Sequence, residues 1–179
     1  MKKLLISLLL LGSVFANTFA QAYDVVEAGE DYNDKANEVY FSVGTTSALP
    51  IALTVVTFGL ITMGEGESIP VTFMGGYNHF FSDDHFGVGG FVTYERAFGC
   101  NIVTAQAEIT GQYGWEHVKF FHSLSLGVGV LTNGSDPGFF PAFDLTLLGV
   151  KFDFTNFNIF VDFSLPTTSI LKIGASYKF

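Results

Sequence analysis

The chain has 179 residues, of which 49% are hydrophobic and only 14% are charged, and its formal net charge is −9. Soluble domains carry charged residues at about a quarter of their positions, so this composition disfavours an ordinary soluble domain. The acidic balance excludes nucleic acid as an expected partner, and a single cysteine, Cys100, excludes an intramolecular disulfide. One domain is expected at this length.

The first 20 residues have the pattern of a secretory signal peptide. A basic start, Met1-Lys2-Lys3, precedes an apolar stretch from Leu4 to Val14, and small residues follow at Ala16 and Ala20. The apolar stretch is shorter than the roughly 20 residues that a membrane-spanning helix needs. We expect cleavage after Ala20, with Ala16 as the alternative.

An acidic segment, residues 21–37, follows the expected cleavage site. It contains no sustained apolar period, and we interpret it as a solvated lead-in located in the periplasm. Removal of residues 1–20 takes away two lysines, which leaves six basic against 17 acidic residues, a net charge of −11. Residues 38–179 then form the expected main domain.

Residues 39–64 contain no charged side chain, which raises the possibility of a transmembrane helix. The densest apolar part, residues 49–63, would span roughly 22 Å as a helix, less than the roughly 30 Å hydrocarbon core of a bilayer. The stretch instead favours a first strand over residues 39–45 and a long loop over residues 46–68. A short helix or an additional pair of strands within that loop stays open.

The rest of the sequence divides into seven more segments of strand length with turn residues between them. Each is near the 9–11 residues that a tilted membrane strand needs. The expected strands are 69–80, 86–95, 102–113, 117–131, 142–152, 157–163 and 168–179. Together with the first strand they make eight, and an even number places both chain ends on the same side.

This arrangement gives short connections at one side and longer ones at the other, as outer-membrane barrels have. The expected periplasmic turns are 81–84, 113–117 and 153–156, and the expected outer loops are 46–68, 96–101, 132–141 and 164–167. The alternation of polar and apolar residues slips by one after Leu147, which predicts a β-bulge near Leu148-Gly149.

The last ten residues show the alternation most clearly. Apolar side chains stand at every second position back from Phe179, and small or polar side chains lie between them. Such a strand has one apolar and one polar face. A terminal Phe179 with Tyr177 two residues before it resembles the closing strand of bacterial outer-membrane β-barrels.

That resemblance implies an all-β protein, a transmembrane antiparallel up-and-down barrel of eight strands in the outer membrane. It also implies that Tyr177 and Phe179 are an assembly signal read by the barrel assembly machinery. The run from Leu148 to Phe152 and the ending from Ile170 to Phe179 are similar to small outer-membrane β-barrel proteins of anaerobic gut bacteria. Most of those have no known function, and the resemblance implies a monomer with outer-membrane lipids as its partners.

Charged residues at the polar positions of the expected strands would face the barrel interior. An eight-stranded barrel is just wide enough to be filled by side chains, and buried charges must be paired, so we expect a plugged lumen. A proton path or polar channel is the alternative. The expected lumen charges are Glu95, Glu108, Lys119, Asp144, Lys151, Asp162, Lys172 and Lys178.

The sequence contains no phosphate-binding glycine loop, metal-ligand cluster or nucleophile elbow, so no catalytic residue, cofactor or metal is expected. We considered His122 with Ser123, Ser125 and Glu108, because some eight-stranded outer-membrane enzymes are Ser/His lipid A deacylases. A catalytic pair must share a face, whereas His122 and the two serines alternate onto opposite faces.

The sequence therefore favours a non-enzymatic outer-membrane barrel with a structural or surface-interaction role. Two alternatives remain open. One is a narrow pore or a barrel that binds a small ligand or lipid, and the other is an outer-leaflet lipid A-modifying enzyme.

Overall fold

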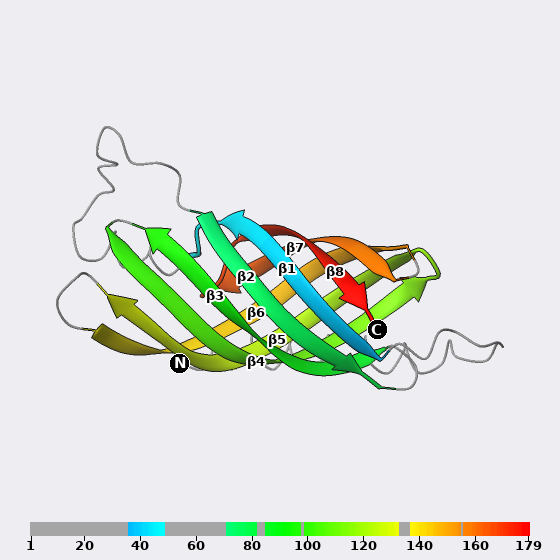
Figure 1. The fold of residues 1–179 in the computed structure, drawn as a ribbon, viewed down its shortest axis with the longest axis horizontal. Helices are drawn as coiled ribbons and strands as arrows, with labels where there is room; N and C mark the ends of the chain where they lie inside the picture. Colours follow the sequence, from blue (N-terminus) through cyan, green and yellow to red (C-terminus); the bar gives the residue numbers. More distant parts are fainter. Residues whose placement is uncertain (1–35, 49–70, 82–84, 98, 133–136, 155) are drawn as a thin grey trace, which may run out of the picture. The chain divides into compact units, whose positions relative to one another are not determined.

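The computed structural model describes residues 36–48, 71–81, 85–97, 99–132, 137–154 and 156–179. They form eight antiparallel strands that pair in sequence order and close into a barrel (Figure 1). The strands are β1 (Asn37–Thr45), β2 (Val71–Phe80), β3 (Phe86–Ala97), β4 (Cys100–Trp115), β5 (Val118–Thr132), β6 (Pro137–Phe154), β7 (Phe157–Pro166) and β8 (Leu171–Lys178). The predicted eight-stranded up-and-down barrel is confirmed.

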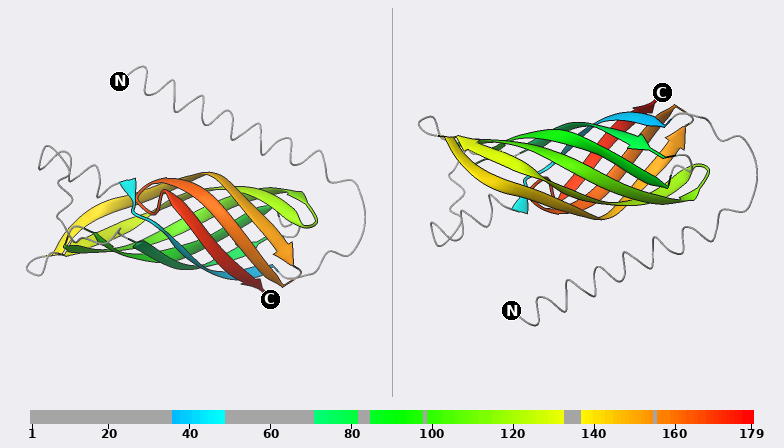
Figure 2. Two further views of the ribbon diagram at one scale, coloured as in Figure 1. Left: turned by 90° about the horizontal axis from the view of Figure 1, so that it is seen from above. Right: turned by 90° about the horizontal axis from the view of Figure 1, so that it is seen from below.

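Closure depends on β1, which pairs with β2 on one side and with β8 on the other. The seam is sealed at its end by two backbone hydrogen bonds. The Asn37 amide donates to the Phe179 carbonyl at 3.3 Å, and the Phe179 amide donates to the Asn37 carbonyl at 2.9 Å. Two further views show the continuous tilted wall that results (Figure 2).

The polarity of this barrel is opposite to that of a soluble protein. Among the described residues, 27 buried side chains are polar or charged and seven are hydrophobic. Large apolar side chains such as Phe41, Leu126, Phe143 and Ile173 are exposed instead. Soluble proteins bury apolar and expose polar residues, so this outer surface is suited to hydrocarbon and the fold is a transmembrane β-barrel.

Within the described ranges, no helix is long and apolar enough to cross a membrane.

Strands β3, β4 and β6 are longer than the sequence predicted, so the expected outer loops 96–101 and 132–141 are wrong in extent. Strand β3 runs to Ala97 and β4 starts at Cys100, while β6 already starts at Pro137. Two prolines, Pro137 and Pro141, had suggested a loop. The structure shows why a strand tolerates them there.

Residues 137–143 of β6 pair only with β5, since the pairing with β7 begins at Asp144. The amide of Phe143 points to this open edge, where it binds the Thr167 hydroxyl. Pro141 and Pro137 lie at the same edge in alternate positions, and proline has no N–H to leave unpaired. Prolines at an edge also discourage pairing with another chain.

The predicted β-bulge is present one residue earlier than expected. Leu147 and Leu148 of β6 lie opposite His122 alone of β5, and the register of β6 with β7 shifts at the same place. Both leucines are therefore exposed, whereas Thr146 before them and Gly149 after them face inward.

The remaining boundaries shift by a few residues. The connection predicted at 113–117 contracts to residues 116–117, and the one predicted at 164–167 moves to 167–170 because β7 continues to Pro166. The barrel starts at Asn37 rather than at residue 38. The expected signal peptide, residues 21–35 of the lead-in and residues 49–68 of the first outer loop lie outside the described residues.

Candidate functional site in the barrel interior

A buried ion pair joins opposite parts of the wall near the end that carries Phe179. The Lys151 ammonium lies 3.0 and 2.8 Å from the two carboxylate oxygens of Glu38. It also lies 5.2 Å from the ring centre of Phe80 and 5.7 Å from that of Phe121. Both charged groups are almost fully buried, and the two rings add cation–π attraction to the ion pair.

A second cluster lies closer to that end, where one carboxylate serves two lysines. Oδ2 of Asp153 is 2.5 Å from the Lys178 ammonium and 3.8 Å from the Lys119 ammonium. Asp153 belongs to β6, Lys178 to β8 and Lys119 to β5. The cluster therefore ties together three strands around the interior.

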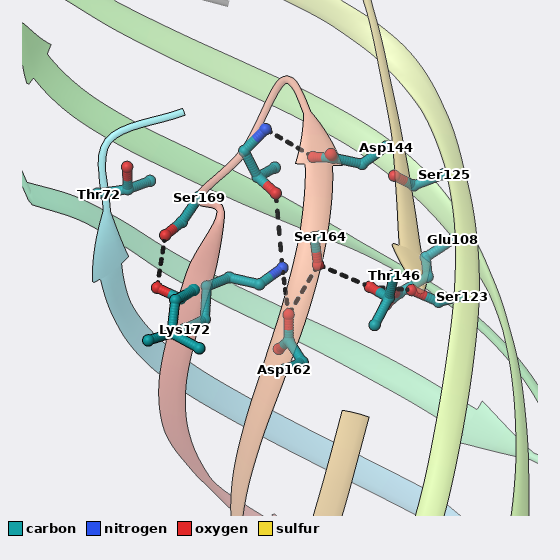
Figure 3. A network of polar contacts seen from close by, with 12 residues as sticks. Thr72, Glu108, Ser123, Ser125, Asp144, Thr146, Asp162, Ser164, Ser169 and Lys172 are labelled. Atoms are coloured by element: carbon teal, nitrogen blue, oxygen red, sulfur yellow. Dashed lines mark hydrogen bonds and ion pairs between the residues drawn. The ribbon is translucent and has the colours of Figure 1, made fainter. Parts of the chain in front are cut away.

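A third ion pair lies farther from Phe179 and continues into a chain of hydroxyl groups (Figure 3). Lys172 is 3.2 Å from Asp162, which accepts a hydrogen bond from the Ser164 hydroxyl at 2.7 Å. The Ser164 and Thr146 hydroxyls are 2.9 Å apart, and Ser123 donates to Thr146 at 2.9 Å. Polar groups on four consecutive strands, β5 to β8, are thus satisfied by each other.

Two carboxylates near the opposite rim bind backbone amides of the adjoining connections. Asp144 accepts hydrogen bonds from the amides of Thr167 and Thr168 at 3.2 and 2.7 Å. Glu95 accepts from the Thr46 hydroxyl at 2.5 Å and from the Ser47 amide at 3.3 Å. The β7–β8 connection and the start of the chain after β1 are consequently drawn into the barrel mouth, where Ser47, Thr167, Thr168 and Ser169 are buried.

Among the described residues, Glu108 is a third interior carboxylate without an ion-pair partner, after Asp144 and Glu95. Its Oε2 accepts hydrogen bonds from the Tyr40 hydroxyl at 2.9 Å and from the Asn78 amide nitrogen at 3.3 Å. No lysine or arginine of the described residues is within ion-pair distance of it. Within the described part of the chain, its direct partners are therefore neutral donors.

Five interior aromatic rings fit into this narrow barrel because each lies over a glycine of a neighbouring strand. A Cβ on Gly76 would be 2.4 Å from the Tyr40 ring, and one on Gly149 would be 2.2 Å from the Phe121 ring. The same relation holds between Gly87 and Phe80, Gly129 and Phe140, and Gly174 and Phe160. Glycine thus provides the space in which each ring fills the lumen, as aromatic–glycine pairs do in sheets.

A small cavity remains at the level of Glu108. Its volume is about 40 Å³, and its lining includes Tyr40, Asn78, Glu108 and Thr110. Since one water needs about 10–15 Å³ of such space, about three waters would fill it. The cavity lies among the interior side chains and is too small for a lipid or a sugar.

All eight predicted lumen charges lie on the inward face of their strands. Seven are buried, and Glu108 is half-buried beside the cavity. Two further inward carboxylates, Glu38 and Asp153, escaped the sequence analysis. Glu38 stands at the edge of the acidic lead-in, and Asp153 fell within a predicted turn. The alternation of side chains along a strand would have placed both inside. Asp153 follows Lys151 by two residues, and Glu38 precedes Tyr40 by two residues.

Tyr177 and Phe179 lie on the outer face, each about half exposed. The position of Phe179 at the seam follows from its backbone bonds with Asn37. A role in assembly is not a property of this geometry and stays a proposal.

His122 and the two serines considered with it are separated by the barrel wall. The Nδ1 atom of His122 lies 2.6 Å from the Leu147 carbonyl, and its ring stacks on Tyr113. Ser123 and Ser125 are buried inside and donate to Thr146 and Gln106 respectively. The structure therefore contains no Ser–His hydrogen bond at this place. Among the described residues no group of His, Cys, Asp and Glu is arranged to hold a metal.

No protein-family model and none of the curated proteins matches this sequence. Solved structures with a similar fold include the N-terminal β-barrel domain of Pseudomonas aeruginosa OprF, at 11% identity and a TM-score of 0.56, over 81% of this chain and 98% of that chain. Neisserial surface protein A (NspA) matches at 13% identity and a TM-score of 0.47, over 80% and 95% of the two chains. Ail of Yersinia pestis matches at 16% identity and a TM-score of 0.42, over 80% of this chain and 95% of that chain. The similarity to the OprF domain shows that this chain has the fold of a small outer-membrane β-barrel.

Proposed function

We propose that this protein is an integral outer-membrane barrel of a Gram-negative envelope, with a structural or surface-interaction role, a closed lumen and no enzymatic activity. The observation that carries the proposal is the interior, where ion pairs join β1, β5, β6, β7 and β8 and aromatic rings occupy the space between the strands. A transport protein of this size would need a continuous polar path instead.

A closed lumen is supported at three levels along the barrel. Glu38 with Lys151 and Asp153 with Lys178 fill the end that carries Phe179. The rings of Tyr40 and Phe160, each over a glycine of the neighbouring strand, fill space farther from that end. At the other end, Asp144 holds the β7–β8 connection inside the mouth.

Location in the outer membrane is supported by the outward apolar face, which suits lipid, and by the fold shared with the OprF domain. The expected signal peptide agrees with export from the cytoplasm. Outer-membrane lipids are then the partners of the outer face, and the barrel needs no second copy to complete its wall.

The first prediction concerns conductance. Protein refolded from urea into planar bilayers is expected to show no steady unitary current, because we expect the ion-paired layers to block a continuous water path. Insertion is verified on the same protein in vesicles by its altered migration in unboiled gels. Reproducible unitary currents would instead support the narrow pore.

A second prediction concerns Phe179 as an assembly signal. Phe179→Ala keeps both backbone bonds to Asn37 and removes a ring whose burial in lipid contributes at most about 1.5–3 kcal/mol. We expect several-fold less protein in the outer membrane of cells, measured by fractionation, while the purified variant still refolds in detergent.

Phe157→Ala is the matched control, because Phe157 pairs with Tyr177 at the same rim and is also on the outer face. It should reach the outer membrane at nearly the normal level. Equal levels of both variants would contradict a signalling role for the terminal ring.

A further inference from the structure

The described interior has more negative than positive charge. Six carboxylates face inward, Glu38, Glu95, Glu108, Asp144, Asp153 and Asp162, against the four ammonium groups of Lys119, Lys151, Lys172 and Lys178. The net charge of these ten groups is −2. Buried charge that is not compensated is costly, so the location of the excess decides what the interior can bind.

Glu108 accounts for part of this excess, since it is one of three described inward carboxylates without a lysine partner. Glu38, Asp153 and Asp162 have lysine partners, and Asp144 and Glu95 accept backbone N–H bonds close to the barrel mouth. Glu108 lies deeper, with a tyrosine hydroxyl and an amide nitrogen as donors. Two ion pairs that line the same cavity, Glu38–Lys151 and Asp162–Lys172, are neutral, so the cavity lining as a whole carries one negative charge.

Two neighbours of Glu108 at the cavity have oxygens without partners. Oδ1 of Asn78 and Oγ1 of Thr110 are buried and make no hydrogen bond, although both side chains belong to the cavity lining. Buried polar oxygens are nearly always satisfied in folded proteins. The carboxylate, amide and hydroxyl oxygens together form a set of hard donors, which suits an alkali or alkaline-earth cation.

We propose that this cavity binds one small monovalent cation of the size of sodium, held by Glu108 with oxygens of Asn78 and Thr110 and one or two waters. A single positive charge balances the single excess carboxylate of the lining, whereas a divalent ion would leave an excess of positive charge. The volume of about 40 Å³ accommodates an ion with a partial hydration shell.

The experiment is thermal unfolding of the refolded barrel in detergent, at constant ionic strength, with sodium exchanged for N-methylglucamine, which is too large for the cavity. A ligand that binds only the folded state raises the midpoint with the logarithm of its concentration. For a chain of this size, we expect the unfolding midpoint to rise by about 3–6 °C for each tenfold increase in sodium concentration above the dissociation constant.

Glu108→Gln keeps the shape of the side chain and removes its charge, so its midpoint should be independent of the cation. Glu95→Gln is the matched control, because it removes a buried carboxylate that binds Thr46 and Ser47 instead. That variant should keep the full sodium dependence, whatever its basal stability.

Three results would overturn the proposal. The first is the same midpoint for the unmodified protein in sodium and N-methylglucamine, which would indicate that water alone fills the cavity. The second is an unchanged sodium dependence in Glu108→Gln. The third is an infrared carbonyl band of a protonated carboxylic acid at neutral pH that disappears in Glu108→Gln, since a proton would then supply the missing charge.

Discussion

Replacing Lys151 with methionine is expected to lower the free energy of unfolding by about 3–5 kcal/mol, the usual cost of leaving one member of a buried ion pair without its partner. Glu38 would keep its charge in a site that is only 2% exposed. Methionine retains the length of the lysine stem but loses the cation–π contacts of the ammonium with the rings of Phe80 and Phe121. The loss therefore combines the uncompensated carboxylate with the smaller cation–π attraction, and urea unfolding of the refolded barrel measures it.

The double variant Glu38→Met with Lys151→Met separates charge from packing. Replacing both members of a buried pair by apolar residues is often neutral, or stabilising by about 1–4 kcal/mol. We expect the double variant to be clearly more stable than Lys151→Met alone. A double variant as unstable as the single one would show that the two groups do not act as a pair.

The second large effect is expected at Gly76. A Cβ there would lie 2.4 Å from the Tyr40 ring and 2.8 Å from Cβ of Phe91. Gly76→Ala should therefore cost about 1–3 kcal/mol, as overpacking does in tight interiors. It should also displace the Tyr40 hydroxyl from Glu108.

The neighbouring Gly75 provides the control. It faces outward, and the nearest atom to a Cβ there is the Tyr40 carbonyl oxygen at 4.0 Å. Gly75→Ala should leave the free energy of unfolding unchanged or raise it by about 0.5–1 kcal/mol, since glycine weakens a strand interior. Equal destabilisation by the two substitutions would contradict the assignment of Gly76 to a filled lumen.

The faces of the strands could be predicted from the sequence because the side-chain period of a strand is two. Lys172 and Lys178 of β8 were placed inward by that period, and Tyr177 and Phe179 outward, as the structure has them. The slip after Leu147 likewise revealed the bulge, since one extra residue reverses the alternation.

The ion-pair partners of the interior side chains could not be predicted from the sequence. Asp153 approaches both Lys178 and Lys119, which lie on different strands, and this depends on how the strands are staggered around the wall. The glycines opposite interior rings were equally hidden. Gly174 faces Phe160 only because of the register between β7 and β8.

The ends of the long strands were missed for a local reason. Pro137 and Pro141 normally end a strand, and nothing in the sequence shows that residues 137–143 of β6 have a free edge. An edge has no ladder bond on that side, so the missing N–H groups cost little there. The ends of these strands could therefore be assigned only from the pairing between strands, which the structure shows.

The central claim, a barrel whose apolar face contacts lipid, is tested most directly along β7. Nitroxide labels are placed on single cysteines at 157, 159, 161 and 163, the outward positions of β7, in a Cys100→Ser background reconstituted in bilayers. The same label at exposed Arg96 near the opposite rim serves as the water-accessible control. We predict high accessibility to oxygen and protection from a water-soluble nickel chelate at positions 159 and 161, with Arg96→Cys open to the chelate. Access of the chelate to all five positions alike would contradict a membrane-spanning barrel.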